Sequence, residues 1–240
     1  MKMFKLVFSM VLAITFLTAV NAMATEMSLQ EIFDDLTVDG PSSVNAETDY
    51  LTNDAYWSIT ASGGSVATMI IELAGYASEN IFGVYSGDEL VPLFTGTAVA
   101  GDQTFLSIKN DGSVYVNLHD TGVDFSGNLF GYYISTPNGT FYSDSTLNED
   151  GEDHLMAYQG NDEDVIELPG LASGLWTDNE FILAWEDLLG SNNPDYDYND
   201  MVLMVESVQP APVPEPTTML LLGSGLIGLA GAGRKKLFKK

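Results

Sequence analysis

A group of oxygen-bearing side chains lies in one short stretch near the end of the chain. Its members are Glu186, Asp187, Asp195, Asp197, Asn199 and Asp200. Alternate residues of an extended segment point the same way, so Asp195, Asp197 and Asn199 can converge on one point. Four or more such oxygens on two adjacent strand ends are the ligand type and number that Ca²⁺ takes, with water completing the shell. The residues alone leave a second interpretation open, an acidic hairpin whose Asp and Asn side chains bond their own backbone.

A second polar cluster occupies residues 148–154 and ends in Asp153 and His154. Gly151 marks a turn within it, and a strand is expected directly after it. An Asp–His pair next to a strand could hold a metal ion or act as a general base. The alternative, which the residues favour, is a polar turn in which a neighbouring carboxylate accepts a hydrogen bond from His154.

Short strands must position both clusters. After Gly40, apolar or aromatic runs alternate with turns rich in Gly, Asn, Asp and Ser. The expected strands cover residues 56–60, 66–73, 81–85, 91–94, 104–108, 114–118, 129–135, 155–159, 165–168, 180–185 and 201–206. Many short strands at this spacing predict an all-β fold, an antiparallel β-sandwich of jelly-roll type. Ahead of them, the capping-box pattern of Ser28 and Glu31 predicts a short amphipathic helix over residues 28–36.

The N-terminal segment has the pattern of a signal peptide. Lys2 and Lys5 precede an apolar stretch, and an Ala-Met-Ala sequence ends at Ala24. A charged region, an apolar region and an A-x-A site together predict export through the Sec machinery, with cleavage after Ala24. Residues 1–24 are therefore assigned to the signal peptide, and residues 25–208 to one acidic β-sandwich domain.

The C-terminal end has three parts with different physical properties. Four prolines are expected to keep residues 209–216 extended as a stalk outside the fold. Residues 217–233 are apolar and just long enough for a transmembrane helix, which with the basic tail occupies residues 217–240. The basic residues that hold this end on the cytoplasmic side of the membrane are Arg234, Lys235, Lys236, Lys239 and Lys240.

This arrangement resembles the PEP-CTERM sorting signal of Gram-negative bacteria that export polysaccharide. The motif residues are Val213, Pro214, Glu215 and Pro216. The resemblance implies that a membrane protease, the exosortase, cuts the chain near this motif. We expect a precursor anchored in the inner membrane, and a processed protein that is exported to the outer surface or the extracellular medium.

The charge of the exported domain is almost entirely negative. The chain has 34 acidic and 8 basic residues, and Lys109 is the only basic residue outside the two terminal segments. Of the acids, only Glu215 lies in the C-terminal tail. Electrostatic repulsion therefore excludes nucleic acid as a partner. The absence of cysteine excludes a disulfide bond and a thiolate nucleophile.

The second half of the domain resembles the 4114 family of domains of unknown function. The resemblance rests on Trp-Glu-Asp-Leu at residues 185–188, Asp-x-Asp-Tyr-Asn-Asp at residues 195–200 and Asp-His-x-x-Ala-Tyr at residues 153–158. Members of this family are often secreted surface proteins, and the resemblance implies Ca²⁺ binding at the acidic motif. Carried over by position, it adds Asp153 to the expected metal ligands and His154 as a neighbour that holds a ligand in place. The motif region spans residues 148–208.

We therefore expect a non-catalytic surface or matrix protein that binds Ca²⁺ and takes part in exopolysaccharide or biofilm organisation. One alternative is a Ca²⁺-dependent carbohydrate-binding module with an aromatic stacking face drawn from Trp57, Tyr132, Tyr133, Tyr142 and Trp176. A third possibility is a glycoside hydrolase with two catalytic carboxylates, whose separation and pKa values the sequence does not show. No serine elbow, cysteine nucleophile or zinc motif in the sequence supports an enzyme.

Overall fold

A computed structural model describes residues 27–73, 77–192 and 194–212 of the chain. The expected signal peptide, sorting motif and transmembrane helix with its basic tail lie outside these described residues. Among the residues that the structure does describe, no helix combines the length and the apolar character needed to span a bilayer.

Helix α1 (Leu29–Leu36) begins where its capping box predicts. The Ser28 hydroxyl accepts a hydrogen bond from the Glu31 backbone N–H at 3.3 Å, and the Ser28 N–H donates to the Glu31 carboxylate at 2.8 Å. These bonds satisfy N–H groups that the first turn of a helix leaves without partners. The helix buries one apolar face on the sandwich, where the Phe33 ring meets Tyr158 edge-on at 4.9 Å.

Within the described residues, the strands form a seven-stranded sheet, a six-stranded sheet and a two-stranded ribbon, all antiparallel. The seven-stranded sheet runs in the order β10 (Leu155–Gln159), β13 (Glu180–Trp185), β14 (Met201–Glu206), β2 (Ser65–Glu72), β5 (Gln103–Ile108), β6 (Ser113–Val116) and β7 (His119–Asp124). The six-stranded sheet runs in the order β15 (Val208–Ala211), β1 (Tyr56–Ile59), β8 (Leu129–Thr136), β3 (Ile81–Ser86) and β4 (Glu89–Phe94), with β9 (Gly139–Tyr142) paired to β8. The ribbon joins β11 (Val165–Ile166) to β12 (Gly174–Leu175), and two short 3₁₀ turns cover Ser145–Leu147 and Gly190–Asn192.

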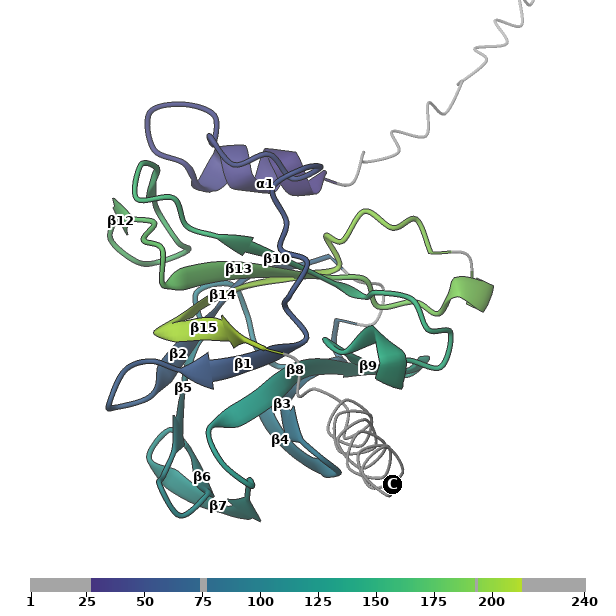
Figure 1. Ribbon diagram of the computed structural model, residues 1–240. Coiled ribbons are helices and arrows are strands. Elements are labelled where there is room, and N and C mark those ends of the chain that lie inside the picture. The colour runs from purple at the N-terminus through teal and green to yellow at the C-terminus, as the bar shows by residue number, and fades with distance from the viewer. Residues whose placement is uncertain (1–26, 74–76, 193, 213–240) are drawn as a thin grey trace, which may run out of the picture.

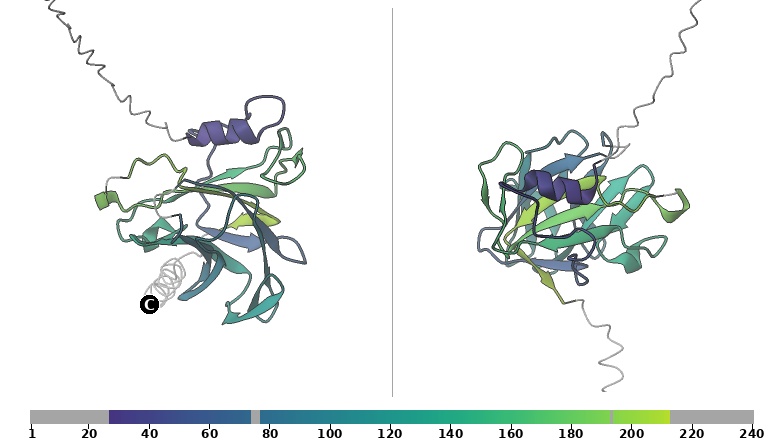
Figure 2. Two further views of the ribbon diagram at one scale, coloured as in Figure 1. Left: turned by 180° about the vertical axis from the view of Figure 1, so that it is seen from behind. Right: turned by 90° about the horizontal axis from the view of Figure 1, so that it is seen from above.

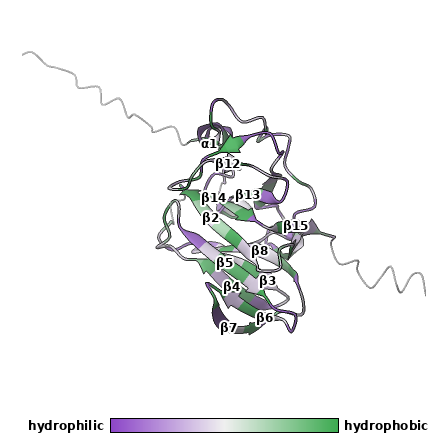
Figure 3. Cartoon of the chain, turned by 90° about the vertical axis from the view of Figure 1, so that its left-hand side faces the viewer, coloured by the Kyte–Doolittle hydropathy of each residue, from purple (hydrophilic) through white to green (hydrophobic). Residues whose placement is uncertain are grey.

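Four strands of the seven-stranded sheet, β10, β13, β14 and β2, have layers on both faces, and Figures 1 and 2 show helix α1 over this part of the sheet. One face packs on the six-stranded sheet, and α1 covers the other. Along β13, Leu183 points into the core between the sheets, while its neighbours Ile182 and Ala184 point towards the helix. A strand buried on both faces needs a continuous apolar run, and this explains the uninterrupted Phe-Ile-Leu-Ala-Trp sequence there. Figure 3 shows such apolar stretches concentrated in the strands of the sandwich.

The all-β sandwich with one short helix confirms the predicted fold class, with β10, β13 and β14 at the predicted residues. Four strands were missed: β7, β9, the two-residue β12, and β15 in the predicted stalk. Strand β7 has almost no buried side chain and therefore carries no apolar signal, and β9 is only four residues long.

The predicted stalk needs a correction at its start. Residues 209–211 belong to β15, in which Gln209 pairs with Ser58 and Pro210 with Trp57. A proline donates no backbone hydrogen bond, but β15 is the edge strand of its sheet, where a missing donor is tolerated. An extended proline-containing segment is thus used as the last strand of the domain.

Candidate metal centre

Two adjacent strand ends bring the acidic residues together. Strands β13 and β14 are antiparallel, with Trp185 opposite Met201. Glu186 and Asp187 leave the end of β13 at the same edge at which Asp200 enters β14. The Glu186 and Asp187 side chains are 0% and 2% exposed, so the strand ends carry these carboxylates into the interior.

The carboxylates form two groups that share one member. In the first, ligand oxygens of Glu186, Asp187 and Asp200 all lie within 4.8 Å of one another. The second group meets the same limit with Glu186, Asp195 and Asp197. The structure therefore brings together five of the predicted ligands, Glu186 and four carboxylates around it.

Backbone hydrogen bonds hold these carboxylates in place. The Glu186 carboxylate accepts from the N–H groups of Leu188 at 3.2 Å and Tyr196 at 3.0 Å. The Asp200 carboxylate accepts from the Asp187 N–H at 2.9 Å, which ties the two strand ends together.

The loop before β14 is not the extended segment that the sequence analysis assumed. Tyr196 and Tyr198 have φ angles of 55° and 54°, in the left-handed region that side chains other than glycine seldom adopt. The chain turns at both residues and so directs Asp195 and Asp197 towards Glu186. Left-handed tyrosines cost free energy and are retained only where the surroundings over-determine them, which is typical of functional loops.

One predicted carboxylate ligand lies outside both groups, and the predicted amide ligand Asn199 makes hydrogen bonds through its nitrogen. The Asn199 amide acts as a donor, to the Asp197 carboxylate at 2.6 Å and to the Met27 carbonyl at 2.8 Å. Asp153 belongs to neither carboxylate group; its charge instead raises the pKa of Asp54, which burial has already raised, to about 7.

His154 lies next to the centre as the favoured polar-turn interpretation expects. Its side chain is fully buried, and Nδ1 donates to the Glu186 carbonyl oxygen at 3.0 Å. Nε2 faces the Asp150 carboxylate at 3.2 Å, and the ring stacks on Phe141 with centroids 4.0 Å apart. His154 thus holds the backbone of the shared residue Glu186.

Burial and mutual repulsion disfavour the ionised form of the carboxylates in this centre. Burial raises the pKa values of Glu186 and Asp187, and the charge of Asp195 raises both further. Burial, together with the charges of Asp187, Glu186 and Asp197, raises the pKa of Asp200 to about 8. Each group thus disfavours ionisation of its neighbours.

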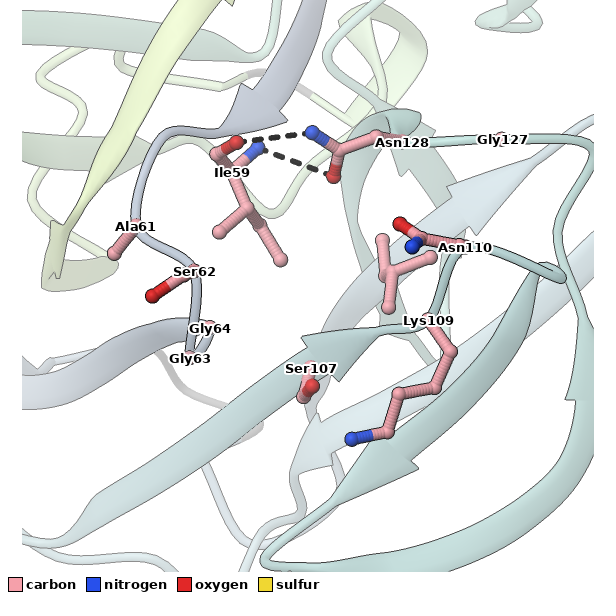
Figure 4. A pocket seen from close by; sticks show the side chains of 11 residues that line it. Ile59, Ala61, Ser62, Gly63, Gly64, Ser107, Lys109, Asn110, Gly127 and Asn128 are labelled. Carbon is pink, nitrogen blue, oxygen red and sulfur yellow. Dashed lines mark hydrogen bonds between the residues drawn. The ribbon is translucent and has the colours of Figure 1, made fainter.

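Lys109, the only lysine in the described ranges, lies elsewhere. It lines a separate pocket with Ser107, Asn110 and Asn128, shown in Figure 4, and its Nζ lies 5.0 Å from the ring centroid of Tyr115. The centre therefore has no lysine or arginine from the described residues to offset its charge.

Sequence reasoning missed two polar residues at this centre, Glu72 and Asn80. Burial raises the pKa of Glu72 to about 7; a hydrogen bond from Asn80 opposes this shift and the charge of Asp187 adds to it. The Asn80 amide donates to the Asp187 carboxylate at 3.1 Å. Both residues are more than a hundred positions from their neighbours in the centre, so no local motif could have indicated them.

The aromatic residues predicted as a carbohydrate-binding face lie mostly in the hydrophobic core. Trp57, Tyr132, Tyr133 and Trp176 are all buried, and Tyr142 is half-buried. These rings stabilise the sandwich and present no stacking platform to solvent.

The fold and site define an all-β sandwich with an acidic centre at one end. Residues 100–208 match the family described as Domain of unknown function (DUF4114), and residues 212–235 match the PEP-CTERM protein-sorting motif. The chain thus carries the sorting motif that implies an exported precursor processed by an exosortase, behind a region similar to DUF4114. The matched region begins at β5 and includes Glu186–Asp200, but it excludes Glu72 and Asn80. No curated protein and no solved structure matches the chain.

Proposed function

We propose that this protein is a non-catalytic component of the cell surface or extracellular matrix whose β-sandwich is stabilised by bound Ca²⁺. The observation that carries the proposal is the convergence of five carboxylates in two groups that share the buried Glu186. Buried charge is costly unless it is paired or coordinates a metal ion. Hard oxygen ligands are the kind that Ca²⁺ takes, and extracellular modules use Ca²⁺ sites of millimolar-range affinity.

The accessibility of the carboxylates supports a binding role over catalysis. A glycoside hydrolase needs its two carboxylates on either side of a bond of the sugar chain. Glu186 and Asp187 are almost fully enclosed, so a polymeric substrate cannot reach them from solvent. Enclosed carboxylates with raised pKa values are suited to holding a cation.

Thermal unfolding of the purified protein in EDTA, 10 mM CaCl₂ and 10 mM MgCl₂ tests the Ca²⁺ proposal, because 10 mM is about 100 times a Kd of about 0.1 mM. A ligand of the folded state at about 100 times its Kd adds about 2.7 kcal/mol to the free energy of unfolding. For a domain of this size that raises Tm by about 5–10 °C. Replacement of Asp195 and Asp197 by Asn should reduce the shift. Equal midpoints in EDTA and CaCl₂ would disprove the metal part of the proposal.

Exopolysaccharide is the proposed partner, because the sorting motif resembles that of polysaccharide-exporting bacteria and the domain has no surface suited to nucleic acid. Co-sedimentation of the protein with polysaccharide from the producing cells, in Ca²⁺ and in EDTA, tests this association. Retention in neither condition would remove the partner but leave the Ca²⁺ site intact.

One observation favours a second candidate function, Ca²⁺-dependent carbohydrate binding. Tyr50 and Tyr196 are 41% and 48% exposed and line a groove that also contains Asp197 of the acidic centre. Exposed tyrosine rings next to a cation could stack on a sugar while the ion binds its hydroxyl groups. Replacement of Tyr196 by Ala should then abolish retention on polysaccharide without changing the Ca²⁺-induced shift in Tm.

A further inference from the structure

The two most exposed tyrosine rings of the described residues lie on one groove. Tyr50 and Tyr196 are exposed, whereas the other tyrosines of the described ranges are buried or half-buried. They come from segments far apart in the sequence, and both line a groove between the start of α1 and the loop before β14 (Figure 1). The groove has a volume of about 480 Å³, within the range of about 300–1,000 Å³ that is usual for small-molecule sites.

Backbone contacts hold both rings at this groove. Tyr50 forms an isolated antiparallel bridge with Tyr158 of β10, and the Tyr196 N–H donates to the Glu186 carboxylate at 3.0 Å. Tyr158 is part of the groove wall, and its hydroxyl donates to the carbonyl of Ala46, another lining residue, at 2.6 Å. The groove therefore presents two exposed aromatic surfaces on a fixed backbone.

The charge around the groove is negative. Glu47 and Asp197 line it, and no lysine or arginine of the described residues does. Burial raises the pKa of Tyr198 on the groove wall, and the charges of Asp153 and Glu186 raise it further. The whole exported domain adds to this potential, since it has a single basic residue. A cationic ligand is therefore attracted from a distance, and an anionic ligand is repelled.

We propose that this groove binds a polysaccharide that carries free amino groups, with its protonated amines against the rings of Tyr50 and Tyr196 and near the carboxylate of Glu47. This inference rests on the proposed exopolysaccharide partner and specifies its chemistry. The face of a tyrosine ring attracts an ammonium group. The same ring has a large apolar surface that packs on the apolar face of a sugar.

A sugar that brings its own positive charge does not require a metal ion. Asp197 belongs to the groove and also to one of the two carboxylate groups. An ammonium group and Ca²⁺ are attracted to the same acid, so bound Ca²⁺ should weaken the binding of an amino sugar. This expectation is the reverse of Ca²⁺-dependent carbohydrate binding, in which the ion holds hydroxyl groups.

The test is isothermal titration calorimetry of the full-length protein in detergent, in EDTA and in 10 mM CaCl₂, with three tetramers. They are the glucosamine tetramer, its fully N-acetylated form and tetralysine. The measurement is made at about pH 6, below the pKa of about 7.7–8.0 of an α-amino group, so that the amines are protonated. We expect the glucosamine tetramer to bind more tightly in EDTA than in CaCl₂. The N-acetylated form has the same rings without the charge and should bind about tenfold more weakly.

Substitutions that keep the net charge separate groove binding from general attraction to an acidic surface. Tyr50→Ala and Tyr196→Ala should each weaken binding of the glucosamine tetramer about two- to fivefold, the size of an exposed cation–π contact. Glu47→Gln should also weaken it. Tyr115→Ala on β6 and Glu89→Gln on β4 lie away from α1 (Figure 1) and should match the wild type.

Three results would overturn the proposal. They are equal affinity for the two sugar tetramers, unchanged affinity in both tyrosine variants, and tighter binding of tetralysine with the same dependence on Tyr196, which would make a basic peptide the ligand. If an alanine variant fails to fold, as judged by near-UV circular dichroism, Leu at the same position removes the aromatic face and keeps apolar volume. Binding of the glucosamine tetramer without retention of the cells' own polysaccharide supports the groove and removes the proposed partner. The Ca²⁺-induced shift in Tm is measured separately, so the proposed Ca²⁺ site does not depend on these results.

Discussion

Two acidic loops meet at the same end of the sandwich, and their carboxylates are used in different ways. In the turn at residues 148–154, Asp150 accepts hydrogen bonds from the Glu152 and Gly190 N–H groups and from His154. Burial raises the pKa of Asp150, but these hydrogen bonds outweigh it and the net shift is downward. Around Glu186, burial and neighbouring carboxylates raise the pKa values instead. Hydrogen bonds within the protein thus stabilise the charge of Asp150 in the first loop, whereas the carboxylates of the second loop repel one another.

The largest expected effect is in the turn at residues 148–154 and does not depend on Ca²⁺. His154→Ala removes a fully buried ring together with its contacts to Phe141 and the Glu186 carbonyl. We expect a loss of about 3 kcal/mol in the free energy of unfolding, similar in Ca²⁺ and in EDTA. Urea denaturation in both buffers measures it, with the exposed His119→Ala as the control. A loss confined to the Ca²⁺ buffer would show that the two loops act as one metal site.

The next effect depends entirely on Ca²⁺. Glu186→Gln removes the carboxylate that both groups share, so we expect the variant to lose the Ca²⁺-dependent stabilisation, about 2.7 kcal/mol at 100 times the Kd. In EDTA it should be at least as stable as the wild type, because a repelling charge is gone. Differential scanning calorimetry compares the variant with the wild type in both buffers: the variant should be less stable in Ca²⁺ and at least as stable in EDTA. Lower stability of the variant in EDTA would mean that Glu186 has a structural role without a metal ion.

A third prediction concerns pH. Burial is the main reason that the pKa of Asp200 is raised to about 8 and that of Glu72 to about 7, above the value of about 4 for an unfolded carboxyl group. The folded state thus binds more protons than the unfolded state between about pH 4 and pH 8, so stability falls as pH rises through that window. Metal-free Tm should decline from pH 5 to pH 8, and Ca²⁺ should flatten the decline. An equal slope with and without Ca²⁺ would place the titrating groups outside the centre.

The smallest expected effect concerns Asp54, a buried acid outside the metal centre. Burial and the charge of Asp153 raise its pKa to about 7, and its Oδ2 has no hydrogen-bond partner among the described residues. Because its pKa is higher in the folded state than in the unfolded state, ionised Asp54 lowers the free energy of unfolding above pH 7. Asp54→Asn should therefore raise Tm by a few degrees at pH 8, equally in Ca²⁺ and EDTA, with no gain at pH 4. A gain seen only in EDTA would instead make Asp54 part of the metal centre.

Much of the fold could be predicted from local sequence because the signals are local. The capping box marks the start of α1, and apolar runs mark β10, β13 and β14 at their observed residues. Strand β7 could not be predicted because its side chains are exposed and polar. Its strand conformation depends on pairing with β6, which a single segment does not encode.

Only part of the candidate site could be predicted from the sequence. Close spacing along the chain allowed Glu186, Asp195 and Asp197 to be singled out before the fold was known. Convergence by strand alternation was the wrong reason, because the loop turns through left-handed tyrosines.

The sequence by itself determined the composition of the molecule: its export and sorting motif, its nearly uniform negative charge, its all-β class and the acidic stretch near its end. These properties depend on residue types and on short spacings. Only the tertiary structure decided which acids accept several hydrogen bonds and which lie close enough to repel one another. Asn80 meets Asp187 across 107 positions, and the charge of Asp153 acts on the distant Asp54. Such contacts depend on how two sheets pack, because burial and charge repulsion act through space and not along the chain.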